Sequence, residues 1–239
     1  DYIEKITLKY IKKVIDEQNP ELIIYNYFNG NDEEKNVRKI EKMYCRSNQE
    51  FKEIFQELDN KFMTYPVWNK AYKREYIEKV EAKFPMGINV AEDFVFNTFI
   101  YRHVQTVSVI NDPLYHYVYR KGESISQKFD LNKMEYALKV YDRVITFYNE
   151  WLPQMKNSAR NMLIYDVSVY INNMFNRGVI LSRKEKKKLI DDILCREQIQ
   201  ECINHVECNG KRNKIIVFLL KHKMKRSLLL IGRISRIGK

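Results

Sequence analysis

The chain contains little glycine, proline or tryptophan and has no long hydrophobic run. Its 239 residues include 7 Gly, 5 Pro and 2 Trp. So few spacer residues exclude long flexible or Pro-rich linkers and collagen-like repeats. No window is long and apolar enough to span a bilayer, and no N-terminal signal peptide is recognisable. The sequence therefore predicts a folded cytoplasmic protein, whose 45% hydrophobic content suffices for one core or for a medium core with a smaller appended unit.

Cysteine is also scarce, with four residues in the whole chain. In a sequence without a secretion signal, four cysteines are most simply free thiols. Cys195, Cys202 and Cys208 flank His205. Cys202, His205 and Cys208 are spaced three apart and fall near one helical face, so a structural zinc site is an alternative. No CxxC pair accompanies them, and small thiols on a helical stripe usually belong to the core. We therefore favour free thiols.

The positive charge is concentrated at the C-terminal end. The formal net charge at pH 7 is +11, and residues 211–239 contain ten Lys or Arg and no acidic residue. The remaining 210 residues therefore carry a net charge of +1. The chain combines a nearly neutral body with a strongly basic tail.

Residues 1–129 alternate signals for helices and strands. Apolar spacings of three and four predict helices, and short β-branched or aromatic runs predict strands. The expected elements are a helix over 3–17, a strand over 22–28, a helix over 48–62 capped by Ser47 or Asn48, a short helix over 74–81, and strands over 106–110 and 114–119 separated by an Asp112-Pro113 turn. This order predicts an α/β fold with a small mixed sheet between helices.

The strand signals stop at about residue 130. Apolar periodicity predicts successive helices over 134–151, 158–177 and 182–202, and there is no internal repeat. Residues 130–239 are therefore expected to form an all-helical extension that ends in a basic amphipathic helix.

Three ordered motifs in the first half carry a family resemblance. They are VWNKAY at 67–72, GINVAEDFVFN at 87–97 and INDPLYHYVYRKGESIS at 110–126. Together they closely resemble the second half of bacterial family-2 glycosyltransferases of the GT-A fold, which move a sugar from a nucleotide-activated donor to a growing glycan. The resemblance covers about residues 1–129 and implies the acceptor-side half of a GT-A domain.

The resemblance also implies a missing region. In such enzymes a nucleotide-binding half with a DDGS-type turn and an Asp-x-Asp metal motif comes first, and none of these motifs is present here. We therefore expect a C-terminal fragment that is inactive alone. The divalent metal expected for the intact enzyme, Mg²⁺ or Mn²⁺, would have its main ligands outside this chain. Asp1 and His116 are the candidate ligands within it, although a lone His in a strand is more often structural.

The adjacent acids Glu92 and Asp93 stand directly before an apolar helical run. Inverting sugar transfer needs one carboxylate to take a proton from the acceptor hydroxyl, and a helix N-terminus keeps a carboxylate ionised. The same physics describes a helix cap, which is the alternative. The resemblance implies that Asp93 is the base and that Glu92 positions or contacts the acceptor.

Five further residues are candidate substrate contacts. Trp68 offers a flat apolar face for a sugar, and Lys70 can contact phosphate or hydroxyl groups. The alternative is that Trp68 belongs to the core and Lys70 is solvated. Arg120, Ser124 and Ser126 lie in a Gly-containing loop that can fold over a diphosphate, or that forms a solvated surface turn.

The tail alternates basic and apolar clusters. This mixture favours a helix that lies on an anionic membrane surface, and residues 211–239 are expected to dock there. The alternatives are a helix packed on the body with a solvated basic face, and nucleic-acid binding, which the scarcity of aromatics in the tail disfavours.

The resemblance, together with the basic tail, implies an inverting glycosyltransferase of surface polysaccharide synthesis. It would use a nucleotide-sugar donor and a glycan or lipid-linked acceptor, and would lie peripherally on the inner face of the cell membrane. The alternative is a non-catalytic module that binds glycan or scaffolds a membrane assembly.

Overall fold

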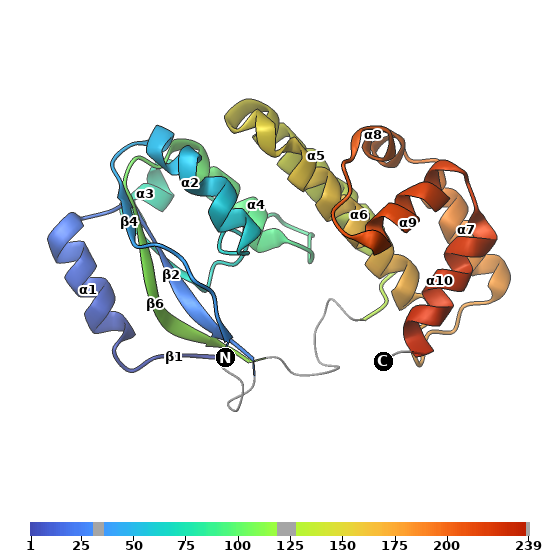
Figure 1. Ribbon diagram of the computed structural model, residues 1–239, viewed down its shortest axis with the longest axis horizontal. Helices are drawn as coiled ribbons and strands as arrows, with labels where there is room; N and C mark the ends of the chain where they lie inside the picture. Colours follow the sequence, from blue (N-terminus) through green and yellow to red (C-terminus); the bar gives the residue numbers. More distant parts are fainter. Residues whose placement is uncertain (31–35, 119–127, 238–239) are drawn as a thin grey trace. The chain divides into compact units, whose positions relative to one another are not determined.

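The computed structural model describes residues 1–30, 36–118 and 128–237. The chain forms two compact units (Figure 1). The first unit contains Asp1–Met86 and the described residues 91–118; the second contains Gly87–Val90 and the described residues 128–237. The first unit is mixed α/β and the second is helical, which confirms the predicted fold class.

The first unit has six strands and four helices among its described residues. In chain order these are β1 (Tyr2–Ile3), α1 (Thr7–Gln18), β2 (Leu22–Asn29), β3 (Asn36–Val37), β4 (Met43–Cys45), α2 (Asn48–Asn60), β5 (Lys70–Tyr72), α3 (Arg74–Lys79), α4 (Glu92–His103) and β6 (Val107–Tyr117).

A parallel pair, β2 and β6, forms the centre of the mixed sheet. Strands β1 and β4 pair antiparallel with β6, while β3 and β5 pair antiparallel with β2. Helix α1 covers one face, where Val14 packs against Ile23 and Leu114, and α2 and α4 cover the other (Figure 1). Because both faces are covered, β2 reads as the nearly continuous apolar run that predicted it.

The predicted turn at Asp112-Pro113 is wrong, because β6 continues through it as one strand with irregular register. Tyr25 pairs with Ile110, whereas the next residue, Asn26, pairs with Pro113. The buried Asn26 amide donates to the carbonyl oxygen of Arg38, and its Oδ1 accepts from the backbone N–H of Tyr27. A bulge tolerates proline inside a sheet, so the local turn signal yields to the parallel ladder.

The expected start of the first helix at Ile3 is also wrong. Tyr2 and Ile3 pair with β6, and the helix begins at Thr7, whose hydroxyl donates to the carbonyl oxygen of Leu114 at 2.8 Å. The strand edge supplies backbone partners that periodicity alone does not reveal. The predicted cap at Ser47 is confirmed, because its hydroxyl accepts from the N–H of Glu50.

The described part of the second unit contains only helices. They are α5 (Lys133–Trp151), the 3₁₀ turn η2 (Pro153–Met155), α6 (Lys156–Asn173), α7 (Arg183–Leu194), α8 (Glu197–His205), α9 (Lys211–Lys221) and α10 (Lys225–Ile237). The single helix predicted over 182–202 is wrong, since α7 ends at Leu194 and a separate helix, α8, begins at Glu197. Within the described ranges, none of the helices combines the length and apolarity needed to cross a membrane.

The tail folds as two helices rather than the one expected. Between α9 and α10, Lys223 takes a left-handed conformation with φ 53°. Among the tail side chains that the structure describes, four apolar ones are buried in the unit: Ile216, Leu219, Leu220 and Leu228. The tail is therefore packed in its unit, as the alternative interpretation proposed, and its basic side chains remain largely exposed.

Gly232 sets how closely α10 approaches α6. A Cβ at this position would lie 2.9 Å from the carbonyl oxygen of Ile171 and 2.7 Å from the ring of Phe175. Neither distance is sterically allowed, so the absence of a side chain permits the observed packing.

Candidate active site

The acid pair opens helix α4 but does not cap it. The N-cap position is Ala91, which adopts a left-handed conformation with φ 51°, and no side chain accepts a capping hydrogen bond there. This conformation is unusual for a residue with a Cβ and requires surrounding structure to hold it. The side-chain cap interpretation of Glu92 and Asp93 is therefore wrong.

Asp93 instead reaches out of its helix to a neighbouring loop. Its Oδ2 accepts a hydrogen bond of 3.1 Å from the backbone N–H of Val67. Asp93 and Glu92 are both partly exposed. Within the described ranges, Oδ1 of Asp93 and the carboxylate of Glu92 form no hydrogen bond or ion pair. Asp93 is thus a fixed carboxylate with one oxygen available.

Asn97 and Tyr101 follow Asp93 at helical spacing and bind the same loop. The Asn97 amide donates to the carbonyl oxygens of Thr64, Tyr65 and Pro66 at 3.0 to 3.3 Å. The Tyr101 hydroxyl donates to the Thr64 carbonyl at 2.6 Å. Positions four apart share a helix face, so one face of α4 holds the loop over 63–69.

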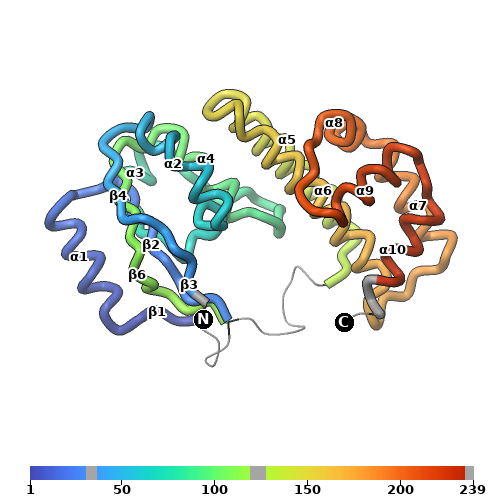
Figure 2. The backbone as a smooth tube through the Cα atoms, viewed as in Figure 1, coloured from blue at the N-terminus to red at the C-terminus, as the bar shows by residue number. Residues whose placement is uncertain are grey.

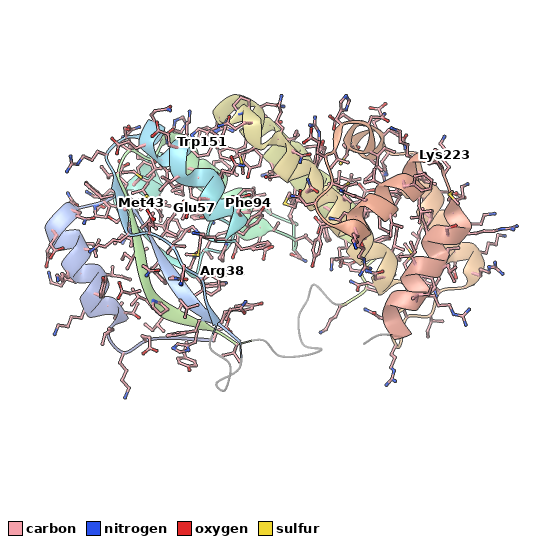
Figure 3. The ribbon with its side chains drawn as sticks, in the orientation of Figure 1. Arg38, Met43, Glu57, Phe94, Trp151 and Lys223 are labelled. Atoms are coloured by element: carbon pink, nitrogen blue, oxygen red, sulfur yellow. The ribbon has the colours of Figure 1, made fainter. Side chains whose placement is uncertain are left out.

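Aromatic packing joins the loop to the helix as well. Phe94, labelled on α4 in Figure 3, stacks on Tyr65 with 4.5 Å between ring centroids. The two motifs 67–72 and 87–97 therefore meet in space, which gives their co-occurrence in the sequence a structural reason.

Lys70 is buried, so the alternative in which it is solvated is wrong. Its ammonium donates to the carbonyl oxygens of Met63, at 2.8 Å, and Pro66, and to Oδ1 of Asn69, at 2.8 Å. Burial lowers the pKa of Lys70 well below its ordinary value, and the negative charge of Asp93 opposes this shift. All three donors are used within the loop, which favours a positioning role. Direct contact with substrate stays a prediction.

Trp68 belongs to an aromatic cluster at the carboxyl ends of β2 and β6, which we call the aromatic platform. Its indole stacks on Tyr115 at 4.6 Å and on Tyr117 at 5.3 Å, and meets Tyr27 edge-on at 4.7 Å. Trp68, Tyr115 and Tyr117 are partly exposed. Ligands of α/β sheets bind beyond the carboxyl ends of the strands, where this platform lies.

The loop over 63–69 connects the platform to Asp93. The Tyr25 hydroxyl donates to the Trp68 carbonyl at 2.6 Å, and the Tyr25 N–H donates to the Asn69 carbonyl at 3.0 Å. Burial raises the pKa of Tyr25 to about 12, so its hydroxyl keeps its proton and this hydrogen bond at neutral pH. The structure thus brings together Asp93, Trp68 and Lys70.

Sequence reasoning missed Arg38 and the platform tyrosines. Arg38, labelled near β2 in Figure 3, donates to the Tyr27 hydroxyl and to the Lys61 carbonyl. No sequence signal singles out this Arg. The tyrosines could have been predicted from the sequence, because Tyr115 and Tyr117 are alternate residues of one strand, and alternate residues share one face.

The two metal-ligand candidates are engaged with protein groups. His116 is buried, its Nε2 lies 2.5 Å from Glu4 Oε1, and its ring stacks on Tyr2 and Phe28. Asp1 accepts from the Val118 N–H at 2.9 Å. The part of the chain that the structure describes contains no group of three or more His, Cys, Asp or Glu able to hold a metal. These residues do not by themselves fit a metal site.

That result also corrects the zinc alternative at the C-terminal cysteines. Cys202 is buried and its thiol lies 3.5 Å from the Arg160 carbonyl, whereas Cys195 is exposed. Burial raises the pKa of Cys202 to about 12. The four cysteines are free thiols, as predicted. The other candidates, Arg120, Ser124 and Ser126, lie outside the described residues.

Comparison with known proteins gives a consistent likeness. No family model matches the chain. It is 26% identical over 156 residues to the uncharacterized glycosyltransferase EpsJ of Bacillus subtilis (strain 168), covering 62% of this chain and 43% of EpsJ. The chain thus spans less than half the length of this curated relative.

Two crystal structures of S. aureus TarS, residues 1–349, share the fold. The complex with UDP-GlcNAc aligns over 100% of this chain and 66% of TarS 1–349, with 17% identity and a TM-score of 0.53. The UDP complex covers 64% of its chain, with 15% identity and a TM-score of 0.52. At these identities the likeness shows the fold.

Proposed function

We propose that this chain is the acceptor-side part of an inverting glycosyltransferase of the GT-A fold and family 2. The observation that carries the proposal is the fixed Asp93 carboxylate, joined through the loop over 63–69 to an aromatic platform at the carboxyl ends of parallel strands. The sequence likeness to EpsJ and the fold shared with nucleotide-sugar-bound TarS support it.

In the proposed reaction Asp93 is the general base. The acceptor hydroxyl attacks the anomeric carbon of the donor sugar, its proton passes to the carboxylate, and the bond to the nucleotide diphosphate breaks with its electron pair leaving on the diphosphate. One oxygen of Asp93 is held by Val67, so the other is oriented for the proton. Such positioning of the base lowers the entropic barrier.

The platform provides a surface for sugar. Trp68 and Tyr117 expose parts of flat apolar rings, against which the C–H faces of a pyranose can stack. Glu92, one residue from the base and without a protein partner among the described residues, is placed to accept from an acceptor hydroxyl.

Charge neutralisation of the leaving diphosphate is assigned to groups beyond the described residues. The loop with Arg120, Ser124 and Ser126 remains our candidate from the sequence. A divalent metal, when bound, would neutralise charge on the diphosphate, and its main ligands are expected outside this chain. The acceptor is proposed to be a glycan or lipid-linked glycan of surface polysaccharide.

The test is transfer by the complete encoded protein, since the 156 matched residues cover only 43% of EpsJ. UDP release and a radiolabelled product are measured with UDP-GlcNAc, UDP-glucose and UDP-galactose, each with oligosaccharide and lipid-linked acceptors. Acceptor-dependent UDP release with label in the product is the expected result. Glycan binding without turnover of any donor would contradict the proposal and favour the non-catalytic binding module.

A further inference from the structure

Helices α7 and α10 enclose a groove with cationic walls and an apolar floor. Its volume is about 480 Å³. An adjoining hollow of about 430 Å³ shares Arg183 and Arg226 with it, so the two form one continuous depression. The two helices contact each other within the second unit, and Figure 2 shows them side by side. We call this depression the basic groove; its main lining residues are Arg183, Lys186, Arg226, Arg233, Phe175 and Leu229.

Three guanidinium groups of the basic groove have no hydrogen-bond or ion-pair partner among the described residues. Arg183, Arg226 and Arg233 are exposed and form no hydrogen bond or ion pair with any other residue that the structure describes. In the adjoining hollow Lys225 pairs with Asp191, so one cation there is already neutralised. The three arginines face an open cavity with their charge and donors available.

The apolar floor of the basic groove is held in place by side-chain packing. Lys186 places its ammonium 4.4 Å from the centre of the Phe175 ring, and this ring lies against Gly232 of α10. At the start of α7, the helix that carries Lys186, Ser182 and Glu185 form a reciprocal capping box. The groove is thus held by contacts among α7, α10 and Phe175, a residue that follows the end of α6.

We propose that the basic groove binds the phosphate groups of anionic phospholipids and docks the protein on a membrane surface. Arginine is suited to this role because its planar donors match phosphate oxygens. The sequence predicted membrane docking by residues 211–239 alone. The structure adds α7, from the neutral body, as half of the site, and it restricts the main contacts to the groove rather than to the tail as a whole.

The apolar groups beside the arginines favour lipid over a soluble polyanion. Leu230 lines the groove and is 56% exposed, and Ile234, one turn further along α10, is 55% exposed. Apolar side chains at spacing four beside a row of cations match the boundary between headgroups and acyl chains. A nucleic-acid backbone offers no apolar surface for them.

The first experiment is vesicle co-sedimentation of the 239-residue chain, comparing phosphatidylcholine with phosphatidylcholine containing about one third phosphatidylglycerol. Each cation near an anionic surface strengthens binding roughly fivefold. The triple variant Arg183→Gln/Arg226→Gln/Arg233→Gln should therefore bind the anionic vesicles about a hundredfold more weakly. All three side chains are exposed, so the variant should keep its fold, which a thermal melt checks.

The matched control removes three cations of the same tail region that do not line the groove, in Lys211→Gln/Lys221→Gln/Lys223→Gln. Lys223 lies in the turn between α9 and α10 and is labelled in Figure 3. This variant should lose less than about fivefold in vesicle affinity, the effect of a single surface cation. Equal losses of vesicle affinity in the two triple variants would contradict the assignment of lipid binding to the basic groove and would indicate binding by diffuse positive charge.

A third variant, Leu230→Gln/Ile234→Gln, separates lipid from soluble polyanions. It should weaken vesicle binding while leaving binding to inorganic polyphosphate and duplex DNA unchanged. Unchanged vesicle binding, or tighter binding to DNA than to vesicles at equal salt, would overturn the lipid assignment. These assays contain no sugar donor, so their failure is distinguishable from failure of the proposed transferase function.

Discussion

The two units use polar side chains in opposite ways. In the first unit Asp93, Asn97 and Lys70 all form hydrogen bonds with the loop over 63–69, and Asn97 and Lys70 are buried. In the second unit the charged side chains of α7 and α10 stand exposed around a hollow, and three arginines have no partner in the described structure. The first arrangement fixes geometry, whereas the second leaves charge available to a ligand.

This difference indicates which unit is suited to catalysis and which is suited to docking on a charged surface. A general base must be held to within a fraction of an ångström, which internal hydrogen bonds achieve. Attraction to a surface of many phosphates needs charge and exposure rather than a single geometry. We therefore propose that the first unit performs the chemistry and that the second docks on the membrane.

The largest expected loss of stability comes from removing the contacts that hold the loop over 63–69 in the first unit. Asn97→Ala removes a buried amide that binds three carbonyl oxygens and accepts from the Tyr72 hydroxyl at 2.6 Å. Buried polar groups then lose their partners, and the free energy of unfolding should fall by about 2–4 kcal/mol. Chemical denaturation measures it. The exposed His103→Ala on the same helix is the control, and an equally small loss in both variants would contradict the role of Asn97.

A middle-sized effect is expected in the packing of the second unit. Gly232→Ala gains helix propensity but places a methyl group against the fixed carbonyl oxygen of Ile171. Overpacking should prevail, with a net loss of about 1–2 kcal/mol in unfolding free energy. Ser227→Ala, on the same helix and without this close approach, is the control. A stabilised Gly232→Ala variant would show that α10 can move away from α6.

The smallest effect concerns pH. Burial raises the pKa of Asp166 to about 7, and the charge of Lys133 opposes the shift. Because the folded pKa exceeds the unfolded one, Asp166 contributes stability at low pH that is lost as pH rises toward 7. The free energy of unfolding of Asp166→Asn, relative to that of the wild type, should therefore increase by about 1 kcal/mol from pH 4.5 to pH 8, a figure that allows for the partial exposure of Asp166. Thermal melts at both pH values measure this, and a pH-independent difference would contradict it.

The sequence signals that predicted the fold correctly were those set by burial. The apolar run of β2 and the periodicity of α2, α5 and α6 gave elements of the right kind, with ends displaced by a few residues. The breaks at 195–196 and 222–224 contain neither Pro nor Gly, so nothing local marks them. The bulge at Pro113 depends on a partner strand that local propensity does not contain.

The site was predictable in part. The motifs pointed to Asp93 and Trp68, which the structure brings to one loop. Asn97 and Tyr101 were also within reach, because they stand four and eight residues after Asp93. The contacts of Lys70 and Arg38 were not, since they depend on carbonyl groups whose direction is set by tertiary structure.

The most direct measurement is turnover by the complete encoded protein with Asp93→Asn. The amide oxygen of Asn can still accept from the Val67 N–H, so the loop should remain in place while the base is lost. We expect kcat to fall by about a thousandfold, with donor affinity within twofold of the wild type and with Glu92→Gln less impaired. A rate within tenfold of the wild type would remove Asp93 from the role of base and contradict the account.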